Sequence, residues 1–255
     1  MQFHATAIAP PAGGGVACTL KAAPAITSVN SATDFGGLPQ FAPGSWLEVR
    51  GSNLAVDTRL WAAGDFKGGI APTALDASGV TIAGSAGFVS YISGGQINVQ
   101  APAGGAMGAV QIAVTTCAGT SAPFTVQEQA AVPGLLAPAA FDVNGKQYLA
   151  ALFNDGVTFA GNPGLIPGVP FRPARPGDFI TTYGIGFGGV TPPIAPGIVV
   201  EQANSIPSLV ISFGQTPAVV TYAGLAPDAV GLYQFDLTVP QVPDGDYQVN
   251  TTVRL

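Results

Sequence analysis

Apolar and polar residues alternate with a period of two in short runs along the chain, and glycine or proline interrupts each run. Two clear examples are QINVQAP, residues 96–102, and YQFDLTVP, residues 233–240. Alternation places every second side chain on one face of a strand, so Ile97 in the first run and Phe235 in the second are predicted to face a core. Proline ends both runs, because it cannot donate a hydrogen bond to a neighbouring strand.

Similar runs recur through the whole chain. We predict further strands at SWLEVRG, GVTIAG, FVSYIS and GAVQIAVTTCAG in the first half, and at DFITTYG, LVISFG, AVVTYAG and GDYQVNTTVRL in the second. No segment sustains an apolar stripe with the period of a helix, so we expect very little helix. About seven short strands in roughly 100 residues are typical of an immunoglobulin-like β-sandwich.

Three segments of the first half return in the second half in the same order. Pro43-Gly44 aligns with Pro176-Gly177, Tyr91 with Tyr222, and Gln96-Ile97-Asn98 with Gln234-Phe235-Asp236. The separation drifts by a few residues, as loop insertions produce, so we predict two copies of one domain. The tyrosines are expected to pack at the sandwich ends, and the glutamines to bond to neighbouring backbone.

This repeat divides the chain into four parts. We predict an all-β protein with an extended N-terminal arm at 1–25, a first immunoglobulin-like sandwich at 26–127, a linker at 128–131 and a second sandwich at 132–255. The two sandwiches are expected to join near the segment QEQAAVPG, residues 127–134.

Composition excludes several classes of protein. Charged residues are 9% of the chain, against about 25% in typical globular domains, and hydrophobic residues are 47%. Disordered chains combine low hydrophobicity with high charge, so the 35 glycines and 23 prolines indicate turns rather than disorder. The net charge is −6 with eight Lys and Arg residues, which argues against a nucleic-acid surface or a polybasic membrane patch.

Two cysteines, Cys18 and Cys117, are compatible with one disulfide that ties the arm to the first sandwich. Two unrelated buried thiols are the alternative. No run of 18 uninterrupted apolar residues predicts a transmembrane helix, and MQFHATAIAP lacks the charged and apolar regions of a signal peptide. A removed signal and a longer parent protein both stay open. Low charge and many Gly, Thr, Ser and Ala residues favour an extracellular or cell-surface location.

Four phrases carry a resemblance to a known family: PGSWLEVRGSNLA, VSYISGGQINVQAP, PGDFITTYGIGFG and YAGLAPDAVGLYQFDLTVP. In this order they resemble the Solibacter-type uncharacterised C-terminal domain, whose modules are similar to the IPT/TIG immunoglobulin-like fold of secreted bacterial proteins. The resemblance covers about Ile26 to Leu255. It implies secretion from a bacterium, tandem sandwiches and a structural or adhesive setting, and it supplies no catalytic residue.

Candidates for chemistry are few. A catalytic base would have to be His4, the single histidine, which lies in the arm. Transition-metal sites need clusters of His and Cys, which the chain lacks. Asp142–Gly145 starts like a calcium loop but lacks the closing glutamate, so a hairpin turn is the better interpretation; calcium at an Asp-rich loop stays open. We therefore expect no enzyme, no cofactor and no metal site.

Two functional hypotheses of different class remain. The first is a non-enzymatic structural protein, a surface or filament subunit that associates with itself. The alternative is an adhesion module that binds carbohydrate or another surface protein through loops at the sandwich ends. Trp61 and Phe66 lie in a loop-like segment and are the predicted exposed pair, whereas Trp46 lies in a strand and is expected in the core.

Self-association is expected to use the arm. The segment QFHATAIAP alternates like a strand, with Phe3, Ala5 and Ala7 on one face, and belongs to neither repeat. It could add to an exposed sheet edge of a neighbouring subunit. Sparse charge leaves little repulsion between copies, so a homo-oligomer, extended into a filament, is predicted.

Overall fold

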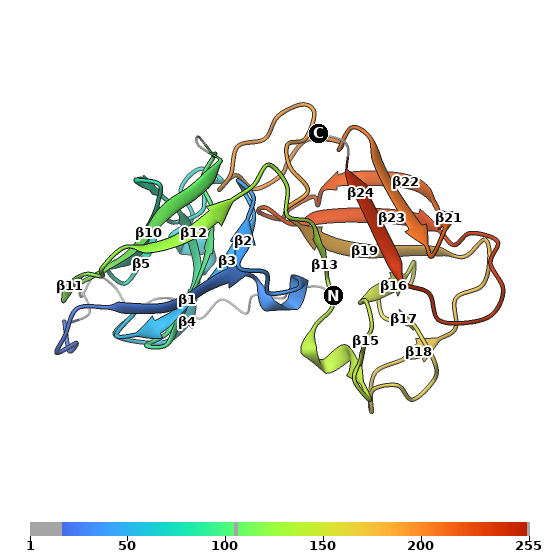
Figure 1. Cartoon of the computed structure of the whole chain (residues 1–255), viewed down its shortest axis with the longest axis horizontal. Coiled ribbons are helices and arrows are strands. Elements are labelled where there is room, and N and C mark those ends of the chain that lie inside the picture. The colour runs from blue at the N-terminus through green and yellow to red at the C-terminus, as the bar shows by residue number, and fades with distance from the viewer. Residues whose placement is uncertain (1–16, 105–106, 254–255) are drawn as a thin grey trace.

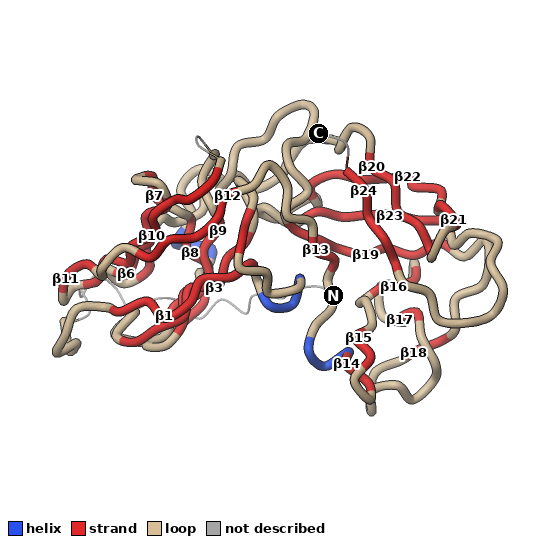
Figure 2. The backbone as a smooth tube through the Cα atoms, viewed as in Figure 1, coloured by secondary structure: helices blue, strands red, loops and turns tan. Residues whose placement is uncertain are grey.

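The computed structural model of the chain describes residues 17–104 and 107–253. In this part the regular structure is β-strand, apart from three single-turn 3₁₀ helices at Thr33–Phe35, Ala63–Asp65 and Ala139–Phe141. The strands build two lobes joined near residue 130 (Figure 1), and long loops connect many of them (Figure 2). The predicted all-β fold is confirmed. None of the described helices is long and apolar enough to cross a membrane.

The first lobe is a sandwich of two mainly antiparallel sheets. One sheet runs in the order β1 (Ala25–Ser31), β3 (Trp46–Ser52), β9 (Gln96–Gln100), β8 (Phe88–Ile92) and β4 (Arg59–Leu60). The facing sheet runs β2 (Gln40–Phe41), β12 (Phe124–Glu128), β10 (Gly108–Thr116), β6 (Ser78–Ile82) and β5 (Ala74–Leu75), with β7 (Ser85–Ala86) and β11 (Gly119–Thr120) paired to β6 and β10.

Alternation along these strands builds the first core. Ile97 and Val99 of β9 are fully buried, as predicted, and Leu47 of β3 lies beside them. Ile112 and Val114 face them from β10 in the other sheet and are equally buried. Complete burial of a Val, Leu or Ile side chain stabilises the fold by about 1.5–3 kcal/mol, so each of these side chains contributes substantially to the stability of the lobe.

The second lobe has one large sheet and one small sheet. The large sheet runs β18 (Phe171–Arg172), β17 (Phe159–Ala160), β16 (Ala151–Phe153), β19 (Phe179–Ile185), β23 (Tyr233–Thr238) and β22 (Val219–Leu225), with β13 (Gly134–Leu135) also paired to β19. The small sheet runs β21 (Thr216–Pro217), β20 (Leu209–Phe213) and β24 (Val249–Val253). A separate hairpin joins β14 (Asp142–Val143) to β15 (Lys146–Gln147) through Asn144-Gly145, the turn that the sequence predicts.

The repeat in the sequence is a repeat in the structure. The ladder β1–β3–β9–β8 corresponds to β13–β19–β23–β22, and β6–β10 corresponds to β20–β24. Both copies even share an irregularity, because the register of β8 shifts just before Tyr91 and that of β22 shifts just before Tyr222. A bulge bends a strand and redirects its side chains, which explains why the phrase around each tyrosine recurs.

The paired glutamines differ from expectation. We predicted that Gln96 and Gln234 bond to neighbouring backbone, but each side-chain amide donates to the residue two positions ahead on its own strand. Gln96 Nε2 lies 2.7 Å from Asn98 Oδ1, and Gln234 Nε2 lies 3.1 Å from Asp236 Oδ1. Residues two apart on a strand project from the same face, so this contact is local and returns wherever the phrase returns.

Cys18 and Cys117 form a disulfide, which closes a loop with a sequence separation of 99 residues. The bridge fixes the start of the described chain to the turn between β10 and β11, at the end of the first lobe that lies away from the second (Figure 1). A bond of this kind is typical of proteins from oxidising compartments.

Removal of the disulfide should weaken the first lobe selectively. A loop of this length restricts the unfolded chain strongly, so Cys18→Ser with Cys117→Ser should lower the free energy of unfolding by about 2–4 kcal/mol. Both tryptophans of the chain, Trp46 and Trp61, lie in the first lobe, so their fluorescence during urea denaturation measures this loss. Tyrosine signals from the second lobe serve as the control and should not shift.

Candidate functional site

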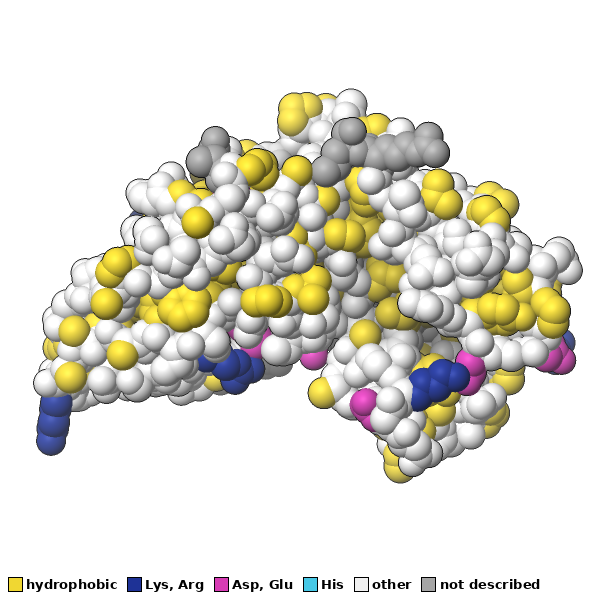
Figure 3. Space-filling view, viewed as in Figure 1, with side chains coloured by type: hydrophobic (Ala, Val, Ile, Leu, Met, Phe, Trp, Pro, Cys, Tyr) yellow, Lys and Arg dark blue, Asp and Glu magenta, His cyan; other side chains and the backbone are white. Residues whose placement is uncertain are grey.

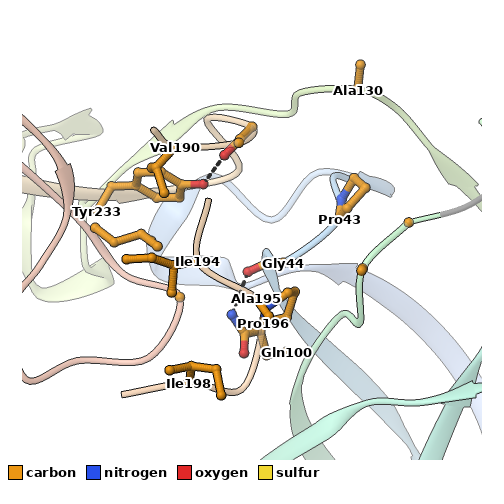
Figure 4. A pocket seen from close by; sticks show the side chains of 16 residues that line it. Pro43, Gly44, Gln100, Ala130, Val190, Ile194, Ala195, Pro196, Ile198 and Tyr233 are labelled. Atoms are coloured by element: carbon orange, nitrogen blue, oxygen red, sulfur yellow. Dashed lines mark hydrogen bonds between the residues drawn. The ribbon is translucent and has the colours of Figure 1, made fainter. Parts of the chain in front are cut away.

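The two lobes meet around a cavity of about 260 Å³ (Figure 4). Pro43, Gly44 and Gln100 line it from the first lobe, and the second lobe contributes residues of the loop after β19 together with Tyr233. Figure 3 shows that charged side chains are sparse on the displayed face of both lobes, as the composition requires. We call this contact between the lobes the joint; its cavity is lined mainly by glycine, alanine, proline and aliphatic residues, with Gln100 and Tyr233 as the polar side chains.

The loop between β19 and β20 forms the second lobe's side of the joint. Gly186 and Gly188 adopt φ of 77° and 88°, a left-handed conformation in which glycine is favoured, and they end the β19 strand. Prolines follow at positions 192, 193 and 196, and proline cannot continue a sheet ladder. The chain consequently leaves the large sheet and crosses to the first lobe before it returns at β20.

Gln100 is the central polar residue of the joint. Only 2% of its surface is exposed. Its Nε2 donates to the Gly44 carbonyl of its own lobe at 2.9 Å, and its Oε1 accepts from the Gly197 amide of the other lobe at 2.7 Å. A buried amide is costly unless its partners are present, so Gln100 favours the one arrangement of lobes that supplies them.

Backbone hydrogen bonds extend this contact. Ala71 N donates to Gly197 O at 2.7 Å, and Val199 N donates to Gly69 O at 2.9 Å. Together they form a short antiparallel bridge in which Ile70 pairs with Ile198. The two lobes are thus connected by ladder-type bonds outside the covalent linker.

Trp46 adds a third connection and corrects a prediction. We expected it in the core, but it is half-buried and its Nε1 donates to Val230 O of the second lobe at 3.0 Å. Trp61 and Phe66, predicted as an exposed pair, are also half-buried. The Trp61 ring packs edge-on against Trp46 at 5.5 Å, and Phe66 packs against Trp61 at 4.9 Å. The three rings therefore pack against one another, in the edge-on and tilted arrangements that aromatic pairs favour.

The joint fixes the orientation of the two lobes and, among the described residues, offers few reactive groups. The described residues that line its cavity include no carboxylate, imidazole, thiol or amine. Tyr233 is the one phenol among them, and burial raises its pKa, so it stays neutral. Its hydroxyl donates to Gly188 O within the second lobe. No group of three or more potential metal-ligating side chains occurs among residues 17–104 and 107–253.

Glu128 is a buried carboxylate at a smaller cavity of about 180 Å³ in the first lobe. It is 2% exposed, and its Oε1 has no hydrogen-bond partner among the described residues. Desolvation therefore raises the pKa of Glu128 above its ordinary value. The folded state holds this proton more tightly than the unfolded state does, so stability is full at low pH and falls as pH rises through the folded pKa.

We expect Glu128→Gln to stabilise the first lobe at neutral pH. The substitution removes the ionised form and keeps the shape, so the gain should be about 1 kcal/mol. The gain should vanish below the ordinary glutamate pKa of 4.5, where the native side chain is neutral too. Urea denaturation of both proteins across this pH range measures the difference. A gain that does not change with pH would contradict the assigned cause.

Some predicted residues lie outside the described part of the chain. Phe3, Ala5 and Ala7, the predicted inter-subunit residues, and His4 belong to residues 1–16. Conversely, sequence reasoning did not single out Gln100 or Gly197, which the structure brings together from positions 97 residues apart.

No protein-family model matches the chain, and no curated protein matches it. Solved structures with a partial likeness include the gamma-CGTase of alkalophilic Bacillus clarkii and a surface glycan-binding protein of Prevotella bryantii. The likeness covers 90% of this chain in both cases but only 24% and 39% of those chains, at 12% and 13% identity and TM-scores of 0.30 and 0.28. At such TM-scores the likeness bears on neither the fold nor the function.

Proposed function

We propose that the chain is a non-enzymatic, extracellular structural unit of a bacterial surface or secreted assembly, in which two immunoglobulin-like sandwiches form one rigid body. The observation that carries this proposal is the joint. Gln100 bonds to both lobes, Trp46 donates across the boundary, and a two-stranded bridge links Ile70 to Ile198. Lobes that move freely share few contacts besides the linker, whereas these two lobes share several hydrogen bonds outside the linker.

Other features support an extracellular setting. The disulfide fits an oxidising compartment, and it ties the start of the described chain to the first lobe. The resemblance to the Solibacter-type C-terminal domain points the same way, and we retain membership in that family as a hypothesis.

Binding of carbohydrate or another surface protein is the alternative. A ligand site normally offers several convergent polar groups that are free to bond. In the joint, the Gln100 amide and the Tyr233 hydroxyl are already bonded within the protein. Trp61 and Phe66 are half-buried against each other, so they offer less surface than an exposed pair would. The structural function is therefore better supported.

A distance measurement between the lobes tests the proposal. Spin labels on Thr125 and Thr221, both exposed and in different lobes, should give one narrow distance distribution by double electron–electron resonance. A broad distribution would show independent lobes and overturn the rigid unit. Binding to a glycan array under the same conditions would favour the alternative.

A further inference from the structure

The disulfide encloses most of the first lobe in a covalent loop. Cys18 lies at the start of the described chain, and Cys117 lies between β10 and β11. The strands from β1 to β10 therefore all lie inside the loop that the bond closes. Of the strands of the first lobe, β11 and β12 follow Cys117, and the chain then passes to the second lobe.

The segment after Cys117 spans the first lobe from one end to the other. β11 lies at the end that is away from the second lobe, and β12 runs from there toward the joint (Figure 1). The chain from Cys117 to Glu128 has about eleven peptide steps, so its fully extended length is about 40 Å at 3.3–3.6 Å per residue. Because the segment already spans the lobe, it can lengthen only a little when it is pulled.

This segment is also bonded to the sandwich along its length. β12 pairs with β10 on one side and with β2 on the other. Ser121, just before β12, is buried and bonds twice to β10: its N donates to Val114 O at 2.8 Å, and its Oγ accepts from Val114 N at 3.1 Å. At the far end of β12, Gln129 N donates to Phe41 O at 2.8 Å.

The linker to the second lobe is equally short. Val132 N donates to Gly186 O of the second lobe at 2.9 Å, so Ala130 and Ala131 are all that separates this bond from the bonded Gln129. A pull on the chain before Cys18 therefore reaches the second lobe through the disulfide, β12 and the linker. It does not have to pass along β1 to β10.

The disulfide is accessible to a reductant, because Cys18 and Cys117 are both exposed. A thiolate of a dithiol attacks one of the two sulfur atoms, and the other cysteine leaves as a thiolate. The second thiol of the reductant then closes its own disulfide, so two electrons pass to the protein and both cysteines become thiols. This exchange opens a loop with a sequence separation of 99 residues.

We propose that the disulfide, β12 and the linker form a redox-sensitive tether, which carries tension across the first lobe and prevents this lobe from lengthening while the bond is intact. Residues 19–116 lie outside the tether, so it limits the extension whatever happens to their hydrogen bonds. This inference rests on the proposed structural function, because tension reaches a unit that is anchored within an assembly.

Reduction changes the strand at which the tension enters. Without the bond, the pull enters at β1, which lies at an edge of its sheet among the described residues. An edge strand is bonded to the sheet along one side, so it separates more easily than an inner strand. Once the lobe opens, the 99 residues of the former loop add about 330–360 Å of extensible chain.

Stretching of single molecules tests the tether. The full chain, with an attachment tag fused to each end, is pulled in optical tweezers under oxidising conditions. The first lobe should add no more than about 40 Å, the extended length from Cys117 to Glu128. After the relaxed, folded protein has been incubated with dithiothreitol, complete unfolding should yield about 330–360 Å more. The length gained from the second lobe is the internal control and should stay the same.

Cys18→Ser with Cys117→Ser provides a second measurement, because this variant should reach the longer length without a reductant. The total length is read after complete unfolding, so the result does not depend on whether the first lobe of the variant folds. An oxidised chain that reaches the same length as the variant overturns the inference. So does an increase that dithiothreitol produces only in chains that were already unfolded. A broad distance distribution between the lobes would instead refute the rigid unit and leave these lengths unchanged.

Discussion

Replacement of Gly197 by alanine should free the second lobe from the first without unfolding either one. Gly197 has φ of 81°, which an L-residue rarely adopts, and an added Cβ would lie 2.2 Å from Cε1 of the Phe88 ring in the first lobe. Alanine costs about 1 kcal/mol in this backbone conformation, and the overlap adds about 1–3 kcal/mol more. Moving the loop away from Phe88 relieves both, but it also breaks the bond to Gln100.

The spin-label experiment measures this release, because the distance distribution between Thr125 and Thr221 should become broad. Gly189→Ala is the matched control, since it lies in the same loop and an added Cβ there meets no atom within 4 Å. The control should keep the narrow distribution. If Gly197→Ala keeps it as well, the joint does not depend on the close approach of this loop to Phe88.

The recurring phrases predicted the fold well because their contacts are local. Tyr91 and Tyr222 follow the same bulge, and Gln96 and Gln234 make the same bond along one strand. Interactions of this kind depend on residues a few positions apart, so a repeated phrase predicts a repeated structure. The alternation that places Ile97 in a core is local in the same sense.

The joint could not be predicted in this way. Gln100 belongs to a strand phrase whose alternation predicts which face it occupies, but nothing near it in the sequence indicates the partner amide of Gly197. That contact depends on how two folded lobes meet. Trp46 shows the same limit, because an aromatic residue in a strand predicts a core position, whereas its indole N–H bonds to the opposite lobe.

The similarity of the two copies in sequence also concealed differences between their structures. The sequence pairs GAVQIAVTTCAG with GDYQVNTTVRL, which the structure places at β10 and β24. In the first lobe β10 is followed by the strand FTVQE, at β12, whereas β24 is the last strand of the described residues. Between β13 and β19 the second copy instead gains a small cluster around Phe141, Phe159 and Phe171, which the alignment of phrases did not predict.

Phe235→Ala should unfold the second lobe at a denaturant concentration at which the first lobe is still native. Phe235 is fully buried, and its ring packs 4.6 Å from that of Phe187. Loss of a buried phenylalanine costs about 3–5 kcal/mol, because the remaining side chains cannot close the cavity. Tyrosine fluorescence should therefore change at lower urea than in the parent protein, while tryptophan fluorescence, which arises only in the first lobe, should not.

The repeat supplies a reciprocal variant for this experiment. Ile97 occupies the position of Phe235 in the first lobe and is also fully buried, so Ile97→Ala should cost about 2–5 kcal/mol and shift the tryptophan transition instead. Opposite effects of the two substitutions would establish that each lobe folds as its own cooperative unit and that the joint only fixes their orientation. If either substitution moves both transitions together, the hydrogen bonds of Gln100 and Trp46 couple the lobes into one folding unit. The boundary near residue 130 would then separate two structural repeats and not two independently folding domains.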